Sequence, residues 1–391
     1  MPNRILIASI CGLIAATARA DKSIDCAKQS LAEALDKENK PQVITFTGVC
    51  QGPIVIHTDA VTLKGVGAAS IEGAGQDALT LDGVQRTILS GFEVRNGRNG
   101  IAAINGAHAT LTAVVSRNHT RHGILLTGGS GAVLNGVTAS GNGVNGLSVE
   151  TGSTATVSGT FTASANRVFG VNVNGSALTF SHANVTVTGN AIGVQVAVEA
   201  NAFIEESSTV INASNNQAVG LTIVSGAQMV AFGGAIYANG NGFNGVSINS
   251  TAGLDLDAAA VLNVSNNAGN GLAIQQHSTM TVFNTPQFSG APGFSTVNAN
   301  GNGLNGVTVL TGSTVTLSGQ GRIVSTGNQG TGINVDNGAA VRLVNSTATG
   351  NAVRDLNLTF GARADLPGLT FGAYACDATV LARGSGVVCP R

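Results

Sequence analysis

Residues 141–152 read GNGVNGLSVETG, and near-copies of this stretch recur along the chain. Each copy opens with an asparagine-containing turn, passes through a glycine and continues as alternating apolar and polar residues. Close copies are GNGFNGVSI at 240–248, GNGLNGVTV at 301–309 and GNQGTGINV at 327–335. The alternation has the period of two that is typical of a β-strand. The repeat therefore predicts one short strand after each glycine turn.

The spacing of the copies indicates a solenoid. Most successive copies are 23 to 27 residues apart, and one interval reaches 35 residues. Such self-similarity is typical of proteins whose coils contact only their neighbours. No proline occurs between Ile54 and Thr285, as expected for strands that are paired on both sides and need every backbone N–H. The LxxLxLxxN pattern of leucine-rich repeats is absent. The sequence therefore predicts an all-β solenoid of about 12–13 coils.

An asparagine stands four residues before the repeat glycine in most copies. Asparagine tolerates the left-handed conformation of a tight bend, and stacked amides can hydrogen-bond from coil to coil. The asparagines in this position are Asn96, Asn142, Asn166, Asn216, Asn241, Asn267, Asn302, Asn328 and Asn351, and Asn118 and Asn190 are displaced by one residue. The pattern resembles the asparagine ladder of right-handed parallel β-helices, the pectate-lyase-like superfamily, over about residues 42–375. The resemblance implies a right-handed parallel β-helix, and the superfamily includes lyases, hydrolases, epimerases and non-catalytic adhesins.

The N-terminal residues predict an export signal. Arg4 supplies a positive charge, residues 5–16 an apolar core and Ala18-Arg19-Ala20 a small-x-small cleavage pattern. We expect the mature chain to begin near Asp21. Beyond this segment no run of eighteen apolar residues could span a bilayer. We therefore expect an exported protein, either periplasmic or secreted, without a membrane span after removal of the signal.

Four cysteines remain after the signal, as two pairs near the two ends of the chain. Cys26 with Cys50, and Cys376 with Cys389, predict two local disulfides in an oxidising compartment. Zinc is the alternative, but neither pair has CxxC spacing or a nearby histidine. The apolar spacing from Ser23 to Lys40 predicts an amphipathic helix that caps one end of the solenoid. The expected organisation is a signal peptide at 1–20, an N-terminal cap of helix, strand and disulfide at 21–52, the β-helix at 53–366 and a disulfide-stapled hairpin-like tail at 367–391.

Composition excludes several classes of partner. Charged residues make up 10% of the chain and the net charge is −1, so bulk charge gives no reason to expect a nucleic-acid partner. The glycine-rich turns resemble calcium-binding nonapeptide repeats, but those need aspartate where this chain has asparagine. The sequence indicates no metal and no cofactor. It does not indicate an oligomeric state.

The outward positions of the repeat strands lack an obvious catalytic set. Enzymes of the resembled superfamily place there a base with a cation, or paired carboxylates. The first outward row consists of Ala102, Leu125, Ser148, Asn172, Gln195, Thr222, Ser247, Ala273, Thr308, Asn334 and Asn357. The next row contains Glu150 and Asp336, which are eight coils apart. We therefore expect a structural or binding protein, directed to carbohydrate or the cell envelope. The alternative is a polysaccharide lyase, hydrolase or epimerase with a non-standard active site.

A basic cluster is the sharpest candidate site. Arg98 and Arg121 both lie two residues before a repeat glycine, so they should stack in adjacent coils. Arginine binds carboxylate and phosphate groups in a bidentate manner, which makes this a candidate site for a uronate or phosphate group. The expected partner of the protein is an acidic or neutral polysaccharide. The alternative is that these are solvated turn side chains. The candidate residues are Arg95, Arg98, Arg117, His119, Arg121, His122 and Glu150.

Overall fold

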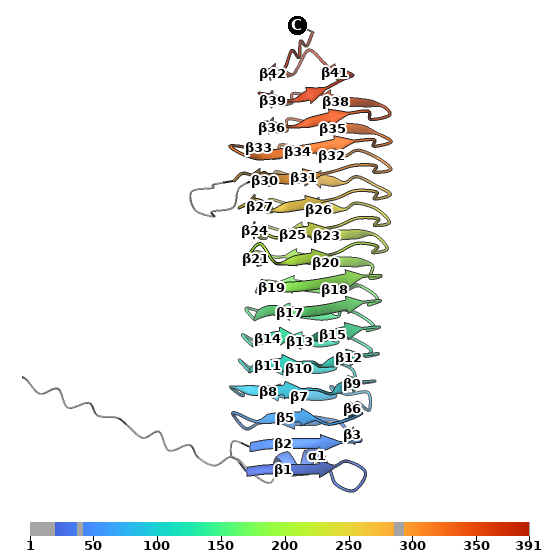
Figure 1. The fold of residues 1–391 in the computed structure, drawn as a ribbon, viewed down its shortest axis with the longest axis vertical. Coiled ribbons are helices and arrows are strands. Elements are labelled where there is room, and N and C mark those ends of the chain that lie inside the picture. Colours follow the sequence, from blue (N-terminus) through green and yellow to red (C-terminus); the bar gives the residue numbers. More distant parts are fainter. Residues whose placement is uncertain (1–19, 37–41, 285–292, 391) are drawn as a thin grey trace, which may run out of the picture.

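The computed structural model describes residues 20–36, 42–284 and 293–390. This part of the chain forms a stack of about 14 turns in which neighbouring turns are joined by parallel strand pairing (Figure 1). One face is a 14-stranded sheet, here called sheet B. Its strands are β4 (Ile54–Ile56), β7 (Leu79–Asp82), β10 (Ile101–Ile104), β13 (Ile124–Leu126), β16 (Leu147–Glu150), β18 (Phe169–Asn174), β20 (Ile192–Ala197), β23 (Val219–Val224), β26 (Val246–Ile248), β29 (Leu272–Ile274), β32 (Val307–Val309), β35 (Thr331–Val335), β38 (Arg354–Leu358) and β41 (Tyr374–Cys376).

The remaining strands form a 28-stranded sheet, here called sheet A, which has two arms. The first arm contains β1 (Ala20–Asp25), β2 (Gln42–Thr47), β5 (Thr62–Gly65), β8 (Thr87–Ser90), β11 (His108–Thr112), β14 (Gly131–Asn135), β21 (Asn201–Glu205), β24 (Gln228–Phe232), β27 (Gly253–Asp257), β30 (Thr279–Val282), β33 (Thr314–Leu317), β36 (Ala340–Arg342), β39 (Arg363–Asp365) and β42 (Leu381–Arg383). The second arm contains β3 (Val49–Gln51), β6 (Ser70–Glu72), β9 (Glu93–Arg95), β12 (Val115–Arg117), β15 (Val137–Ser140), β22 (Val210–Asn212), β25 (Ala235–Tyr237), β28 (Val261–Asn263), β31 (Ser295–Asn298), β34 (Gly321–Thr326), β37 (Thr347–Thr349) and β40 (Thr370–Phe371). The long strands β17 (Thr154–Ser164) and β19 (Ala177–Thr188) run through both arms.

The core lies between the sheets. Ile124, Leu147 and Val171 follow the repeat glycines and are register partners on adjacent strands of sheet B. All three side chains are completely buried, because alternate residues of each strand point inward. Removing these stacked apolar side chains from water is the main driving force for the fold. The alternation after each repeat glycine therefore places its apolar residues in the core, as expected for a strand.

An asparagine ladder runs along one corner of the stack. The Nδ2 of each asparagine donates to the Oδ1 of the next, at 2.8 to 3.3 Å. The ladder contains Asn142, Asn166, Asn190, Asn216, Asn241, Asn267, Asn302, Asn328 and Asn351. It ends at Asp355, whose Oδ1 accepts from the backbone N–H and the Nδ2 of Asn351. Asn190 is displaced by one residue in the sequence pattern, yet its side chain forms a rung of the ladder like the others.

Two of the asparagines predicted for the ladder lie elsewhere. Asn96 and Asn118 both have a φ of 59°, the left-handed conformation that asparagine tolerates at a tight bend. They occupy the corner position that Gly141 fills in the next coil. The ladder positions of their coils are the following residues, Gly97 and His119. Sequence spacing alone could not separate the corner residue from the rung.

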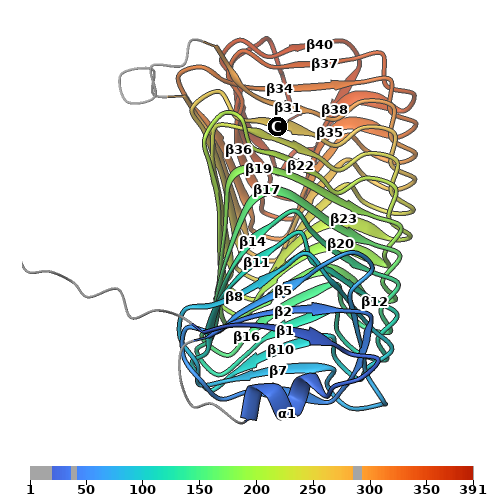
Figure 2. The ribbon, with the colours of Figure 1, turned by 60° about the horizontal axis from the view of Figure 1, so that its bottom comes forward.

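The N-terminal end departs from the predicted helix. Helix α1 comprises only Leu31–Asp36 and buries Leu31 and Leu35 (Figure 2). Ser23–Asp25 lie instead in β1, where Ile24 is buried and pairs with Phe46 of β2. The prediction of a helix from Ser23 to Lys40 is therefore wrong in extent, because β-pairing buries Ile24. Residues 37–41 lie outside the described residues, and a capping role for α1 remains a prediction.

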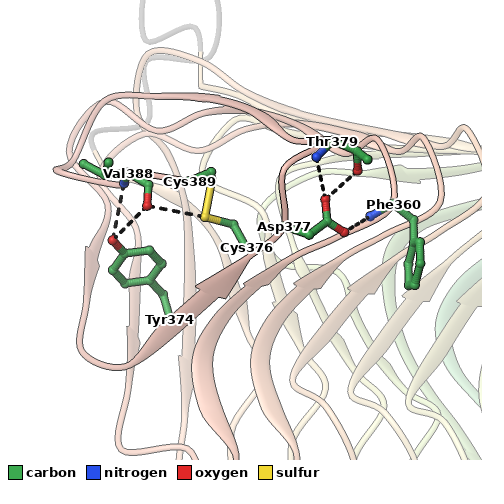
Figure 3. The surroundings of a disulfide bond; sticks show 7 residues. All are labelled: Phe360, Tyr374, Cys376, Asp377, Thr379, Val388 and Cys389. Carbon is green, nitrogen blue, oxygen red and sulfur yellow. Dashed lines mark hydrogen bonds between the residues drawn. A yellow bond between two sulfur atoms is a disulfide. The ribbon is translucent and has the colours of Figure 1, made fainter. Parts of the chain in front are cut away.

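Both predicted disulfides are formed. Cys26 bonds to Cys50. Cys376 bonds to Cys389 (Figure 3). The second bond does not close a hairpin, since β41 pairs in parallel with β38 and β42 with β39. These strands extend the stack beyond the 12–13 predicted coils. The sequence did not indicate this last coil because it has strands but no glycine motif.

Two further stretches of the sequence lie outside the residues that the structure describes. Of the predicted signal segment, 1–20, the structure describes only Ala20, the first residue of β1. Residues 285–292, within the 35-residue interval, are also not described. Among the described residues no helix is long and apolar enough to cross a membrane.

Candidate functional site

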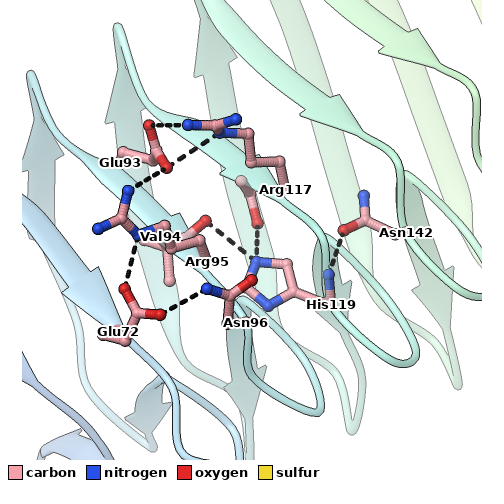
Figure 4. Close-up of polar contacts among 9 residues, drawn as sticks. Glu72, Glu93, Val94, Arg95, Asn96, Arg117, His119 and Asn142 are labelled. Atoms are coloured by element: carbon pink, nitrogen blue, oxygen red, sulfur yellow. Dashed lines mark hydrogen bonds and ion pairs between the residues drawn. The ribbon is translucent and has the colours of Figure 1, made fainter.

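Two arginines of the predicted basic cluster pair with carboxylates on the second arm of sheet A (Figure 4). The Nε of Arg95 lies 2.6 Å from Oε2 of Glu72, and its Nη1 lies 3.5 Å from Oε1 of Glu93. Arg117 donates from Nε and Nη2 to the two oxygens of Glu93, at 2.9 and 3.0 Å. The hydrogen bond from Arg95 to Glu72 raises the pKa of Arg95. These charges are thus compensated within the sheet.

Arg98 is compensated in the same way at the asparagine corner. Its Nε and Nη2 donate to both carboxylate oxygens of Asp77, at 2.9 and 2.8 Å. Burial opposes ionisation of Asp77, but hydrogen bonds from Arg98 and Asn99 lower the pKa of its carboxyl below the usual range. The backbone N–H of Arg121 donates to the carbonyl of Arg98 at 2.7 Å, so these arginines stack in adjacent coils as predicted. In the described part of the chain, Arg121 forms no ion pair.

Sequence reasoning missed Glu72, Asp77 and Glu93. Each lies 21 to 24 residues before the arginine that it binds, which is one coil of the repeat. Writing the sequence in rows of one coil would have brought each carboxylate next to its arginine. Three arginines of the cluster, Arg95, Arg98 and Arg117, are thus paired with carboxylates. The binding of an anion at this cluster stays a prediction.

His119 is a ladder residue. Its Nδ1 accepts from the backbone N–H of Gly97 at 3.0 Å, and its own backbone N–H donates to Oδ1 of Asn142 at 3.1 Å. Nδ1 is therefore unprotonated, and Nε2, 3.1 Å from the carbonyl of Val94, carries the hydrogen. The residue is 2% exposed, and burial lowers its pKa to about 4. A neutral imidazole thus reproduces the acceptor and donor of an asparagine amide.

His122 occupies the second asparagine position of the repeat, where GNGVNG has Asn145. In three coils that asparagine donates from Nδ2 to a hydroxyl three residues later, at 3.1 Å; the pairs are Asn145–Ser148, Asn244–Ser247 and Asn305–Thr308. The coil of His122 has Leu125 in place of the hydroxyl. His122 is only 3% exposed, and its Nδ1 is buried without a hydrogen-bond partner.

The surroundings of His122 are polar. Burial lowers the pKa of His122, Glu150 acts to raise it and Arg121 to lower it. On β16 of sheet B, the Oγ of Ser148 donates to Oε1 of Glu150 at 2.5 Å. Of the predicted residues, Arg121 and Glu150 are thus both close enough to influence His122 electrostatically. Arg95 and Arg117 belong to the separate charge network on sheet A.

A row of uncharged polar side chains crosses the outer face of sheet B. Gln195 donates from Nε2 to Oδ1 of Asn172, and Asn172 donates from Nδ2 to Oγ of Ser148, both at 3.2 Å. Farther along, Asn357 donates to Asn334 at 2.7 Å. The row joins register partners on adjacent strands: Ser148, Asn172, Gln195, Thr222, Ser247, Ala273, Thr308, Asn334 and Asn357. Among the described residues, no group of three His, Cys, Asp or Glu side chains is placed to hold a metal ion.

Comparison with known families agrees with this architecture. Residues 54–218 match the family model described as the right handed beta helix region. The protein is a right-handed parallel β-helix. None of the curated proteins compared with the sequence of this β-helix matches it.

Several solved β-helix structures are similar over most of their length. One is the A-module of a mannuronan C-5 epimerase of Azotobacter vinelandii, with 14% identity, coverage of 90% of this chain and 93% of that chain, and a TM-score of 0.48. A surface adhesin of Streptococcus pneumoniae has 9% identity, coverage of 90% and 86%, and a TM-score of 0.35. A PL6 family polysaccharide lyase of Pseudopedobacter saltans has 9% identity, coverage of 94% and 93%, and a TM-score of 0.32. At these identities the similarity concerns the fold alone.

Proposed function

We propose that this β-helix is an exported protein that binds a linear polysaccharide along the outer face of sheet B. The observation that carries the proposal is the row of amides and hydroxyls from Ser148 to Asn357, in register on successive strands and interrupted only at Ala273. Neighbouring strands are about 4.8 Å apart, a spacing comparable to the length of one hexose unit. Where the row is partly exposed, at Gln195, Asn334 and Asn357, the sugars of an extended chain can meet amide donors and acceptors.

The charge arrangement favours a neutral polysaccharide over an acidic one. Arg95, Arg98 and Arg117 are paired with carboxylates, and an acidic polymer would have to displace those partners. Amides and hydroxyls are suited to neutral sugar hydroxyls, for which they both donate and accept hydrogen bonds. Two disulfides support an oxidising compartment, either periplasmic or extracellular. The division into a signal at 1–20, a cap at 21–52, a β-helix at 53–366 and a tail at 367–391 is part of this proposal.

A panel of immobilised neutral and acidic polysaccharides tests the proposal. The informative variant is Gln195→Ala combined with Asn334→Ala, which removes two amides from the partly exposed part of the row. We expect its affinity for the retained neutral polymer to fall about tenfold. The matched control is Thr156→Ala with Thr179→Ala, on the outer face of sheet A. An equal loss in both variants, or no retention of the wild-type protein on any polymer, contradicts the proposal.

A second candidate function is favoured by His122. Its imidazole is buried with an unpartnered Nδ1, beside Arg121, which forms no ion pair in the described part of the chain, and within the electrostatic influence of Glu150. A neutral imidazole can act as a base, and a guanidinium can neutralise the carboxylate of a uronate. This arrangement fits proton abstraction next to that carboxylate, the step shared by lyases and epimerases.

The test of catalysis uses the residue that the repeat itself supplies. His122→Asn restores the asparagine found in the neighbouring coil and should keep the fold. We expect the wild-type protein to release unsaturated products from a uronate polymer, or to exchange its C5 proton with solvent, and His122→Asn to lose that activity. Absence of both reactions across a panel of uronate polymers rejects this second candidate.

A further inference from the structure

The distribution of charge along the chain is uneven. Between Val168 and Gly321 the sequence contains neither lysine nor arginine. The same segment contains five acidic residues: Glu199, Glu205, Glu206, Asp255 and Asp257. The whole protein has a net charge of only −1, so this middle part of the stack is locally anionic. A charged ligand attracted to it must be a cation.

A cavity of about 520 Å³ opens on the first arm of sheet A within this segment. Its walls include Phe203, Val230 and Phe232, and its rim includes Glu205 and Glu206. Phe203 is 41% exposed and Phe232 is 45% exposed. Neither ring contacts another aromatic ring or an arginine in the described part of the chain, so their faces are open to a ligand.

Strand register places the aromatic rings among the carboxylates. On the outer face, Phe203 of β21 is aligned with Val230 of β24 and Asp255 of β27. In the next outward row, Phe232 of β24 is aligned with Glu205 of β21. The two rings are thus diagonal neighbours. In the two preceding coils these rows hold threonine and serine, such as Thr179 and Ser181. The aromatic and acidic substitutions therefore coincide at one place in the repeat.

The carboxylates are not consumed by internal contacts. Glu205, Glu206 and Asp255 form no ion pair and no side-chain hydrogen bond within the described part of the chain. No three acidic, histidine or cysteine side chains among the described residues converge on a metal position. Carboxylates that surround aromatic faces without converging are unsuited to a small hard cation, which needs several oxygens at short distance. They suit a larger organic cation.

We propose that this cavity binds an organic ammonium group, such as the amino group of a glucosamine unit or the head group of a small amine. The ring faces of Phe203 and Phe232 attract the cation through their quadrupoles. Glu205 and Glu206, which line the cavity, supply the compensating charge. The site lies on sheet A and the proposed polysaccharide surface lies on sheet B, so the two sites are independent.

Calorimetric titration of the full chain at pH 6 tests the proposal. The probes are tetraglucosamine, its fully N-acetylated counterpart, and choline. We expect tetraglucosamine to bind, the uncharged N-acetylated probe not to bind, and 1 M sodium chloride to weaken binding markedly. Binding of choline would identify the ammonium head group as sufficient, and binding of tetraglucosamine alone would identify an amino sugar. Absence of binding by both cationic probes, or equal binding of both tetrasaccharides, overturns the proposal.

Variants locate the site. Phe203→Ala combined with Phe232→Ala should weaken binding at least fivefold, and Phe203→Tyr should retain it because the ring face remains. Glu205→Gln with Glu206→Gln should weaken binding and reduce its dependence on salt. The controls are Phe243→Ala, an exposed phenylalanine at the asparagine corner, and Glu199→Gln, an acid of the same segment outside the cavity. Unchanged thermal unfolding midpoints exclude misfolding as the cause. Binding lost equally in the controls overturns the assignment, and binding of neutral polysaccharide should be unaffected by the cavity variants.

Discussion

The Nδ1 of His119 accepts a hydrogen bond from the backbone N–H of Gly97 in the preceding coil, at 3.0 Å. Asn142 accepts in the same way from the backbone N–H of His119 at 3.1 Å. An imidazole therefore occupies one rung of an otherwise amide ladder. Its Nε2 replaces the amide NH₂ and reaches the carbonyl of Val94. His119 thus makes the contacts of a ladder residue, and a binding role for it stays a prediction.

The first prediction concerns the chemistry of that rung. His119→Leu leaves the N–H of Gly97 without its acceptor in a buried place, and we expect it to lower the free energy of unfolding by about 1–3 kcal/mol. His119→Asn restores the residue used in the next coil and should cost much less. Chemical denaturation of both variants measures the difference. Equal losses would show that the hydrogen bonds do not matter at this position.

A second prediction concerns the effect of pH on the same residue. Burial lowers the pKa of folded His119 to about 4, whereas an unfolded histidine titrates near 6.5. The unfolded chain therefore binds the proton first, and the stabilisation present above pH 6.5 is lost as the pH falls towards 4. The loss amounts to about 3 kcal/mol. It should be visible as a lower unfolding midpoint at pH 4.5 than at pH 7.

The matched variants for this pH effect are His119→Asn and His108→Asn. His108 is exposed on sheet A, so its replacement should leave the pH dependence unchanged. His119→Asn should reduce it. A wild-type pH dependence that survives in His119→Asn would assign the effect to other groups.

The third prediction concerns the paired arginines. Glu93→Gln breaks partly exposed ion pairs with Arg95 and Arg117, so we expect a change in unfolding free energy of less than about 1 kcal/mol.

Asp77→Asn should instead change binding, because it leaves Arg98 uncompensated beside Arg121. We expect Asp77→Asn to be retained more strongly than the wild-type protein on a column of acidic polysaccharide. The double variant Arg98→Ala with Arg121→Ala should show no such gain, and equal retention of all three proteins would refute compensation.

The fourth prediction concerns the two disulfides. Each closes a short loop, of 24 and 13 residues in sequence separation, and each should stabilise its end of the stack by about 3 kcal/mol in the chain-entropy description. Because coils contact only their neighbours, the loss should remain local. Cys376→Ser with Cys389→Ser should therefore increase hydrogen exchange in β41 and β42, with β18 and β20 unaffected. Uniform loss of protection along the stack would indicate global cooperativity instead.

Most of the fold could be predicted from the sequence repeat. Alternation after each glycine placed Leu147 and Val149 inside, and the asparagine spacing placed Asn142 in a ladder. The ends of helix α1 could not be predicted from the sequence, because the spacing of apolar residues around Ile24 fits a helix and a half-buried strand equally well. The end of the stack was missed because β41 and β42 have lost the glycine motif.

The site was harder to predict, because its partners are one coil apart in the chain. Glu72 and Arg95 are separated by 23 residues yet adjacent on neighbouring strands. The cavity depends on Phe203 and Phe232, which become diagonal neighbours only once the register is known. The two histidines of 118–123 suggested chemistry, whereas alignment with GNGVNG identifies them as occupants of the two asparagine positions. Register, more than residue type, separates a functional group from a structural one in this fold.

Every rung of the asparagine ladder points the same way. Each residue donates to the coil that follows it in the chain and accepts from the coil before it. Asp355 breaks this chain, since a carboxylate accepts from Asn351 and from the N–H of Gly372 but has no hydrogen to pass onward. The ladder is therefore a one-way series with its own terminator. Whole coils can be added or deleted between His119 and Asn351 without changing the terminator, so the length of the protein can vary in steps of one coil.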